Sequence, residues 1–243
     1  MPEPLMLLLS VMTLWLFHSW VTSGHLVHAV GAVLSAALCF LVKVPTLYLG
    51  FPLLAIAIQR WAWRFILRPA LWCYAVAILA PAVLWYIHAA DLFAETGLTF
   101  GIWNRYGYDK WDRGVLLTFD FYRQLGWRFF DSIYTPVGCA AIILGLYACF
   151  KDRRDWVLWG WLGGLLLYVL IVPEGNRKLH YYQLPFVPIG ALFAARGVAW
   201  LNERYSEYGK NQLDRRRVLF IGVGVVGFLA YSVSALGPYY DQP

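Results

Sequence analysis

Three groups of polar residues stand at the ends of apolar stretches in this sequence, where they can share a site at one membrane surface. The first is Lys43, in the turn L-V-K-V-P-T, which is the only basic residue among the first 59. The second is the run 176–185, N-R-K-L-H-Y-Y-Q-L-P, which leads into a later apolar stretch. The third is the pair Asp91 and Glu95, just beyond the stretch 70–88.

Cations beside carboxylates at a membrane boundary are typical of a site for a lipid phosphate. Arg177, Lys178 and Lys43 can bind the phosphate, and Asp91 or Glu95 is a candidate base for an acceptor hydroxyl. The structural alternatives are a Lys43 that snorkels to the headgroups and an Arg177–Lys178 pair that acts as a stop signal.

The apolar stretches themselves predict an integral membrane protein. The chain is 60% hydrophobic and 14% charged, too apolar for a soluble globule of its 243 residues. Several stretches are shorter than the roughly 20 residues that a spanning helix needs, but their Trp, Tyr and Gly flanks can extend into the interface. We predict an all-α bundle with about eight transmembrane helices in a single membrane domain 1–243, at about 4–20, 26–42, 44–59, 70–88, 135–150, 156–173, 180–198 and 217–236.

The charges between these stretches predict their orientation. Segments 60–68, 151–154 and 196–217, with the adjoining Asp155, hold twelve of the twenty Lys and Arg against five acids, a net charge of +7. The other connections hold eight basic and nine acidic residues, a net charge of −1. The positive-inside rule places the first set in the cytoplasm. The overall charge of +6 is then a topology signal, and no nucleic-acid partner is needed to explain it.

The same alternation predicts that Met1 lies outside. The first nineteen residues contain Glu3 but no Lys or Arg, so they lack the basic start of a signal peptide. We therefore expect this sequence to be the downstream part of a longer protein; the alternative is a naturally short protein with an outside N-terminus.

The outer loop 89–134 is long and rich in aromatic residues. Its second half, Gly114–Tyr134, places Leu116, Phe119 and Tyr122 near one helical face, which predicts a helix in the plane of the interface. Such a helix can anchor the protein as an aromatic belt, or it can cover a cavity at membrane level.

A glycine motif near the C-terminus superficially resembles a dinucleotide fingerprint. Gly222, Gly224 and Gly227 form a G-x-G-x-x-G, but no room follows them for a βαβ unit. We expect these small residues to let one membrane helix approach another.

Three segments together carry a family resemblance. The turn L-C-F-L-V-K-V-P-T-L-Y-L-G-F-P-L-L (Leu38–Leu54) resembles the lysine–proline hairpin of the polytopic glycosyltransferases of family 39. The segment H-Y-Y-Q-L-P-F-V-P-I-G-A-L-F-A-A-R-G (His180–Gly197) is similar to the late helix of the bacterial members, and W-Y-I-H-A-A-D-L-F (Trp85–Phe93) to the start of their large outer loop. The family includes dolichyl-phosphate-mannose–protein mannosyltransferases and aminoarabinose transferases of lipid A. The resemblance covers about residues 1–236.

This resemblance implies the GT-C fold, a helical membrane bundle whose outer loops form a cavity open to lipid. It also implies an enzyme that transfers a sugar, with inversion, from a polyprenyl-phosphate donor to a lipid, glycan or protein acceptor. The bacterial members imply a multi-pass protein of the cytoplasmic (inner) membrane. No cofactor is identified from the residues; a divalent metal is possible, and no metal ligand is assigned.

The family's residues carry over only in part. Lys43, His180, Tyr181 and Gln183 match family positions that line the outer cavity, while Arg177 and Lys178 are added on the ground of charge. The family's catalytic acid lies in an outer loop between its first two helices, and this sequence starts at about the fourth helix. The resemblance therefore implies a C-terminal portion without that acid.

Two other functions remain open from the sequence. A transporter or flippase of lipid-linked sugar would also have outer cations, but it usually carries charged residues at mid-membrane and a repeat between its halves. A membrane scaffold without catalytic activity would fit the missing acid. Binding without turnover would separate this scaffold from an enzyme.

Overall fold

The protein is all-α in the part of the chain that its computed structural model describes. No strand occurs in this part, as the composition predicts. The chain forms two compact units, Met1–Leu117 with Trp156–Pro185 and Thr118–Asp155 with Phe186–Pro243. The described residues are 3–97, 111–151, 155–208, 222–224, 226–227, 229–231 and 233–234.

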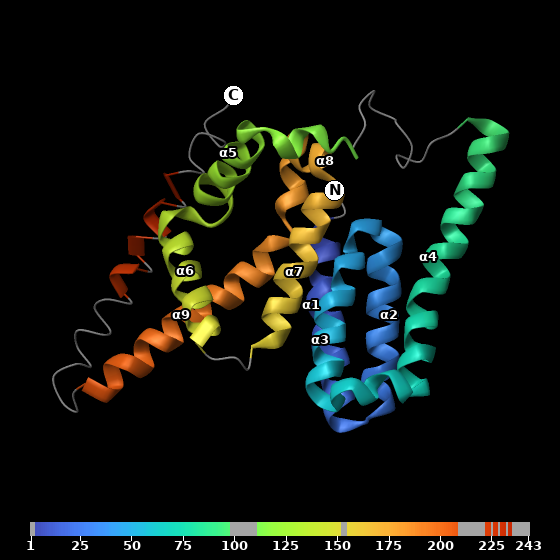
Figure 1. Cartoon of the computed structure of the whole chain (residues 1–243), viewed down its shortest axis with the longest axis horizontal. Coiled ribbons are helices and arrows are strands. Elements are labelled where there is room, and N and C mark those ends of the chain that lie inside the picture. The colour runs from blue at the N-terminus through green and yellow to red at the C-terminus, as the bar shows by residue number, and fades with distance from the viewer. Residues whose placement is uncertain are drawn as a thin grey trace. The chain divides into compact units, whose positions relative to one another are not determined.

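The first unit is built around three helices that lie side by side, α1, α2 and α3 (Figure 1). Helix α4 packs against α2, and α7 packs against α3. In chain order its elements are α1 (Glu3–Ser23), α2 (Leu26–Val42), the 3-10 turn η1 (Val44–Leu49), α3 (Gly50–Trp61), the 3-10 turn η2 (Ala62–Leu67), α4 (Pro69–Thr96), the 3-10 turn η3 (Gly114–Leu117), α7 (Trp156–Ile171), α8 (Pro173–Lys178) and the 3-10 turn η5 (His180–Gln183).

Helices α1 and α2 form a hairpin with a polar seam. Gly24 ends α1 with a φ of +74°, a left-handed conformation that glycine adopts without strain. Between the helices, the Thr13 hydroxyl donates to the Ser35 oxygen over 3.1 Å, and the Ser10 oxygen lies 3.4 Å from the Cys39 sulfur. All four side chains are buried. Small hydroxyl residues that hydrogen-bond across a seam stabilise helix pairs in lipid, where such groups find no water.

Helices α3 and α7 approach closely because α7 presents a G-x-x-x-G stripe. A Cβ atom on Gly164 would lie 2.5 Å from the Tyr48 carbonyl oxygen, and one on Gly160 would lie 2.9 Å from the Ala55 Cβ. Both distances are too short for real contacts, so the packing requires glycine at these positions.

The second unit contains a sharp bend. Its elements are α5 (Phe119–Arg128), the π-helical turn η4 (Phe129–Ile133), α6 (Thr135–Lys151) and α9 (Phe186–Tyr208). The segment Phe119–Ile133 meets α6 at an angle of 108°, at Thr135 with a φ of +64°. Helices α6 and α9 then pack closely, because a Cβ on Gly145 would overlap the Phe193 carbonyl.

The bend at Thr135 separates the helix that we predicted to lie in the interface from the helix that we predicted to span the membrane. Phe119, Tyr122 and Trp127 on α5 are exposed, as an interfacial helix requires. Phe121, on the same helix, is buried instead, at 1% exposure. The placement of α5 in a membrane interface stays a prediction.

Among the residues that the structure describes, two helices, α1 and α4, are long and apolar enough to cross a membrane. A third span results if the bent pair Phe119–Ile133 and Thr135–Lys151 counts as one. Helices α2 and α7 are apolar but shorter. The structure therefore supports a membrane protein, whereas the bundle of eight spans stays a prediction.

Several predicted boundaries are wrong for identifiable reasons. The stretch 44–59 begins as the 3-10 turn η1, whose second residue is Pro45. The stretch 180–198 contains the turn η5, and α9 begins at Phe186, after Pro185. The loop predicted from residue 89 starts later, because α4 continues to Thr96 and ends at the left-handed Gly97.

The G-x-G-x-x-G near the C-terminus makes no close approach to the residues that the structure describes. Ideal Cβ atoms on Gly222, Gly224 and Gly227 would have no neighbour within 4 Å. The close helix contacts of the described residues lie elsewhere, at the glycines of α6, α7 and α9.

Candidate functional site

Lys43 is held in a rigid turn between α2 and η1. Its backbone is extended, its N–H donates to the Cys39 carbonyl over 3.1 Å, and Pro45 follows at the start of the next turn. The Thr46 hydroxyl closes the turn through short contacts to the carbonyl oxygens of Lys43 (2.6 Å) and Cys39 (3.1 Å). The K-V-P-T sequence therefore fixes the point from which the lysine side chain leaves the backbone.

The Lys43 ammonium lies between a carboxylate and two aromatic rings. Its Nζ is 3.2 Å from Oε1 of Glu3, and it lies 4.6 Å and 4.7 Å from the ring centroids of Tyr181 and Tyr182. The lysine side chain is 18% exposed and the glutamate side chain 5%. At these distances both rings attract the cation, most strongly where water is excluded. The structure thus brings Lys43 beside the 180–183 run, 138 residues along the chain from Lys43 to Tyr181.

Lys43 lines a cavity of about 520 Å³ in the first unit. Among the described residues that line it, Lys43 is the one that carries a charge; the others are apolar or aromatic, apart from a glycine. The aromatic part of the wall comes from Tyr48, Phe51, Tyr86, Trp111, Tyr168 and Tyr182. This volume is within the range of small-molecule sites, and a single cation in apolar surroundings suits an amphiphile with an anionic head.

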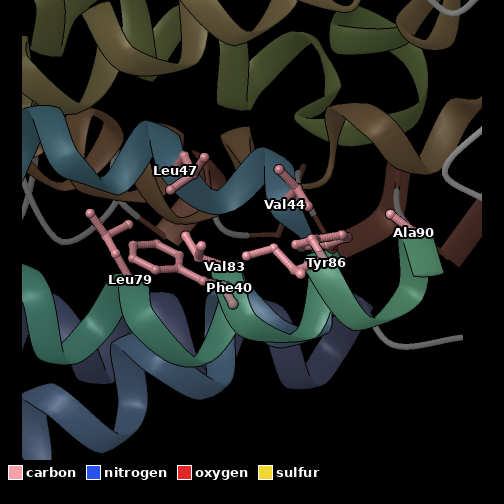
Figure 2. Close-up of a pocket in the computed structure, with 9 residues that line it drawn as sticks. Phe40, Val44, Leu47, Leu79, Val83, Tyr86 and Ala90 are labelled. Atoms are coloured by element: carbon pink, nitrogen blue, oxygen red, sulfur yellow. The ribbon is translucent and has the colours of Figure 1, made fainter.

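A second cavity of about 370 Å³ adjoins the first. Both cavities are lined by Val44, Leu47 and Tyr86. Figure 2 shows its two walls: Phe40, Val44 and Leu47 come from α2 and η1, and Leu79, Val83 and Tyr86 come from α4. Its lining side chains are apolar except for the Tyr86 hydroxyl. The two cavities thus share part of their walls, and Lys43 lines the larger of them.

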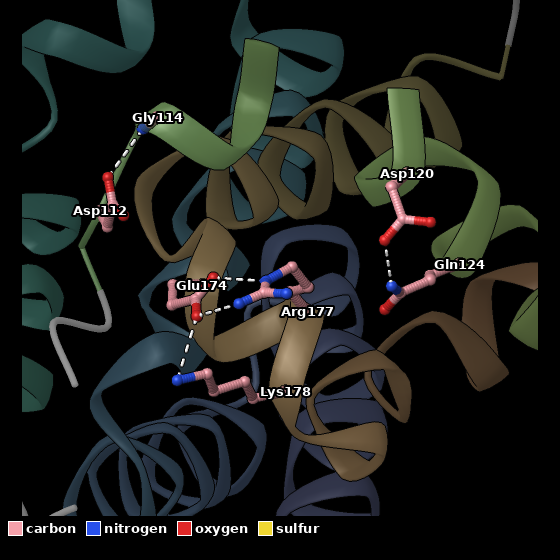
Figure 3. Close-up of polar contacts among 7 residues, drawn as sticks. All are labelled: Asp112, Gly114, Asp120, Gln124, Glu174, Arg177 and Lys178. Carbon is pink, nitrogen blue, oxygen red and sulfur yellow. Dashed lines mark hydrogen bonds and ion pairs between the residues drawn. The ribbon is translucent and has the colours of Figure 1, made fainter. Parts of the chain in front are cut away.

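Arg177 and Lys178 are paired with an acid of their own helix. Glu174 accepts two hydrogen bonds of 2.6 Å from the Arg177 guanidinium, and Lys178 Nζ lies 3.3 Å from the same carboxylate (Figure 3). The hydrogen bonds from Arg177, aided by Lys178, lower the pKa of the Glu174 carboxyl although burial opposes this. Neither cation lines the two cavities. Their contacts therefore stabilise α8, and Lys43 is better placed than either to meet a ligand in the cavities.

The remaining residues of the 180–183 run have different surroundings. His180 is exposed, and Tyr181 contacts Lys43 but does not line the cavity. Gln183 is fully buried, and its amide donates to the Asn176 carbonyl over 2.6 Å, so it holds η5 against α8. Tyr182, which sequence reasoning did not select, lines the cavity directly.

Asp91 and Glu95 make no ion pair or hydrogen bond with Lys43. Both are exposed on the last two turns of α4, and neither forms an ion pair or hydrogen bond with the described residues. The nearby Ala90 lines the second cavity, but the two acids do not. We predicted that Asp91 and Glu95 share a site with Lys43, but the structure shows no contact between either acid and this lysine.

Glu3 is the functional-site residue that sequence reasoning undervalued. It is the only acid before Asp91, and Lys43 is the only basic residue before Arg60. One acid and one base in so long an apolar segment tend to pair, because an isolated buried charge is costly. This signal in the sequence could have identified the pair.

No three His, Cys, Asp or Glu side chains lie together as a metal ion would need, among the residues that the structure describes. Comparisons with protein-family models, with curated proteins and with solved structures found no match to this chain. The function must therefore be inferred from the geometry around Lys43.

Proposed function

We propose that this protein is a membrane glycosyltransferase of the family 39 type that binds a polyprenyl-phosphate-linked sugar. The observation that carries the proposal is the position of Lys43, whose ammonium borders an apolar cavity of about 520 Å³. A polyprenyl phosphate has the matching parts, a long apolar chain and one phosphate. The adjoining cavity of about 370 Å³ would take part of the chain.

The proposed reaction transfers the sugar to an acceptor hydroxyl. The acceptor oxygen attacks the anomeric carbon, the bond from that carbon to the phosphate oxygen breaks, and the phosphate leaves with the bonding electrons. A base takes the hydroxyl proton, and the anomeric configuration inverts. Lys43 would stabilise the charge that develops on the leaving phosphate. Asp91 and Glu95 are the candidate bases by sequence, although neither contacts Lys43.

Changing Lys43 to Ala is expected to weaken binding of a polyprenyl-phosphate sugar by about tenfold, because one phosphate cation is lost. The measurement is the Kd of the purified protein in lipid nanodiscs. Lys178→Ala is the matched control, since Lys178 lines neither cavity, and it should change the Kd little. Neutral polyprenol should bind wild type and Lys43→Ala alike. Equal losses in the two variants, or no binding by wild type, would contradict the proposal.

The fate of the bound lipid separates a transferase from a carrier. A transferase converts the polyprenyl-phosphate sugar into polyprenyl phosphate, whereas a flippase moves the lipid intact. Chromatography of lipids extracted from membranes that contain the protein, an acceptor pool and labelled donor would distinguish them. Appearance of polyprenyl phosphate that depends on Lys43 would support the transferase.

The proposal also requires Lys43 to face the outside. The charge count places the end of α4 outside and the turn η2 in the cytoplasm. After Cys73→Ser removes the exposed native thiol, a cysteine introduced at Glu95 should react with a membrane-impermeant reagent in intact cells. A cysteine at Arg64 should react only after permeabilisation. The reverse pattern would place Lys43 on the cytoplasmic side and exclude the proposed orientation.

A further inference from the structure

We infer that Glu3 makes the site selective for ligand charge, so that a phosphodiester head group binds more tightly than a phosphomonoester. This inference rests on the proposed binding of a lipid phosphate at Lys43. A phosphodiester carries one negative charge, and a phosphomonoester carries about 1.5 to 2 near neutral pH. The residue that distinguishes them would be the buried acid beside the phosphate-binding cation.

The geometry places an acid against the Lys43 ammonium, although Glu3 itself lines neither cavity. Oε1 of Glu3 lies 3.2 Å from Lys43 Nζ, and the glutamate is 4% exposed. Its second oxygen, Oε2, is buried and has no hydrogen-bond partner among the described residues. The negative charge of Glu3 is therefore balanced by Lys43 but not dispersed over further donors at Oε2.

The ion pair changes what the cavity attracts. Lys43 alone would present one positive charge to the cavity, whereas Lys43 with Glu3 sums to zero. Adding a diester then leaves one net negative charge, and adding a dianionic monoester leaves two. Because like charges repel strongly where water is excluded, the second charge is disfavoured more than the first.

This selectivity would suit the direction of the proposed reaction. The donor is a diester, because its phosphate joins the polyprenyl chain and the sugar. The product is a monoester, because transfer of the sugar frees one phosphate oxygen. Repulsion from Glu3 would then favour loading of the donor over retention of the spent carrier.

Two short lipids of equal chain length test the inference, dodecyl phosphate as the monoester and methyl dodecyl phosphate as the diester. Their Kd values are measured with the full chain in nanodiscs at about pH 8, where the monoester is doubly charged. Wild type should bind the diester more tightly. Glu3→Gln should strengthen diester binding by about tenfold and monoester binding by up to about a hundredfold. The reason is that each negative charge on the ligand is no longer repelled by the Glu3 carboxylate. The ratio of the monoester Kd to the diester Kd should therefore fall about tenfold.

Matched variants separate the effect of the Glu3 charge from any structural effect of the substitution. Glu3→Asp keeps the charge and should keep the wild-type ratio. Asp120→Asn removes an equal charge from an exposed acid that lines neither cavity, and it should also keep the ratio. An unchanged ratio in Glu3→Gln, or a wild type that prefers the monoester, would overturn the inference. The wild-type preference decides the matter if Glu3→Gln does not fold. Failure of the proposed function would look different, since neither lipid would then bind wild type in a way that depends on Lys43.

Discussion

Replacing Gly164 by alanine is expected to loosen the packing of α3 against α7 and to weaken lipid binding together. The new Cβ would lie 2.5 Å from the Tyr48 carbonyl oxygen and 3.1 Å from the Phe51 Cβ, and the first of these is backbone that cannot rotate away. Gly164, Tyr48 and Phe51 all line the cavity beside Lys43. We expect a loss of about 1–3 kcal/mol in the free energy of unfolding, with the cavity distorted in the protein that still folds.

The neighbouring Gly163 supplies the control for this change. A Cβ on Gly163 would meet nothing within 4 Å, so Gly163→Ala adds the same methyl group to the same helix without a clash. Because alanine is the better helix former, this variant should be as stable as wild type or slightly more so. Thermal unfolding in one detergent, with lipid binding measured in parallel, compares the two. Equal stabilities would show that α3 and α7 are not held together at Gly164.

The helices were predictable wherever apolar runs ended at clear signals. The prediction 26–42 coincides with α2, and 135–150 differs from α6 by one residue at its C-terminal end. The predicted boundaries were wrong where a run of apolar residues continued through a change in backbone geometry. Pro45 follows Lys43 in an unbroken apolar stretch, yet the chain there turns as a 3-10 helix held by the Thr46 hydroxyl. Hydropathy averages over a window and does not register such a local hydrogen bond.

The candidate site was predicted at its cation, whereas the weaker sequence signal for its acid was not used. A lone lysine at a proline turn between apolar stretches identified Lys43. Tyr181 was selected from the family resemblance, and in the structure its ring lies 4.6 Å from the Lys43 ammonium. Glu3 stands 40 residues before Lys43, and the packing of α1 against α2 brings the two side chains to 3.2 Å; their being the lone acid and the lone base of this apolar segment is the sequence signal for the pair. The sequence likewise does not show that Glu174 neutralises the cations of its own short helix, because that requires the residues 173–178 to be helical.

Replacing Glu174 by glutamine is expected to give the other large effect. The buried carboxylate accepts two hydrogen bonds from Arg177 and lies 3.3 Å from Lys178 Nζ (Figure 3). Removing one member of a buried pair leaves the other charge uncompensated, at a cost of about 3–5 kcal/mol. The side chains of Arg177 and Lys178 are 35% and 41% exposed, so solvent screens part of the charge that would be left uncompensated. We therefore expect a loss of about 2–3 kcal/mol in the free energy of unfolding.

The same carboxylate predicts a loss of stability in acid. The cations hold the pKa of Glu174 below that of an unfolded glutamate, so the unfolded chain binds a proton more readily than the folded one. The contribution of Glu174 is thus complete above the ordinary pKa of glutamate and is lost as the pH falls through the lowered pKa. Glu174→Gln should lack this component, so the difference in stability between wild type and variant should shrink between neutral pH and about pH 3.

An exposed acid in the same spacing provides the comparison for Glu174. Asp120 pairs with Arg123 at i,i+3, as Glu174 does with Arg177, but its side chain is 49% exposed and that of Arg123 is 68% exposed. Because exposed pairs contribute about 0–1 kcal/mol, Asp120→Asn should change the free energy of unfolding far less than Glu174→Gln does. The measurement is denaturant unfolding of both variants at neutral pH, with the acid series repeated for Glu174→Gln. Similar small losses in the two variants would mean that burial of Glu174 adds nothing to its pairing, and the stabilising role of the α8 cluster would be refuted.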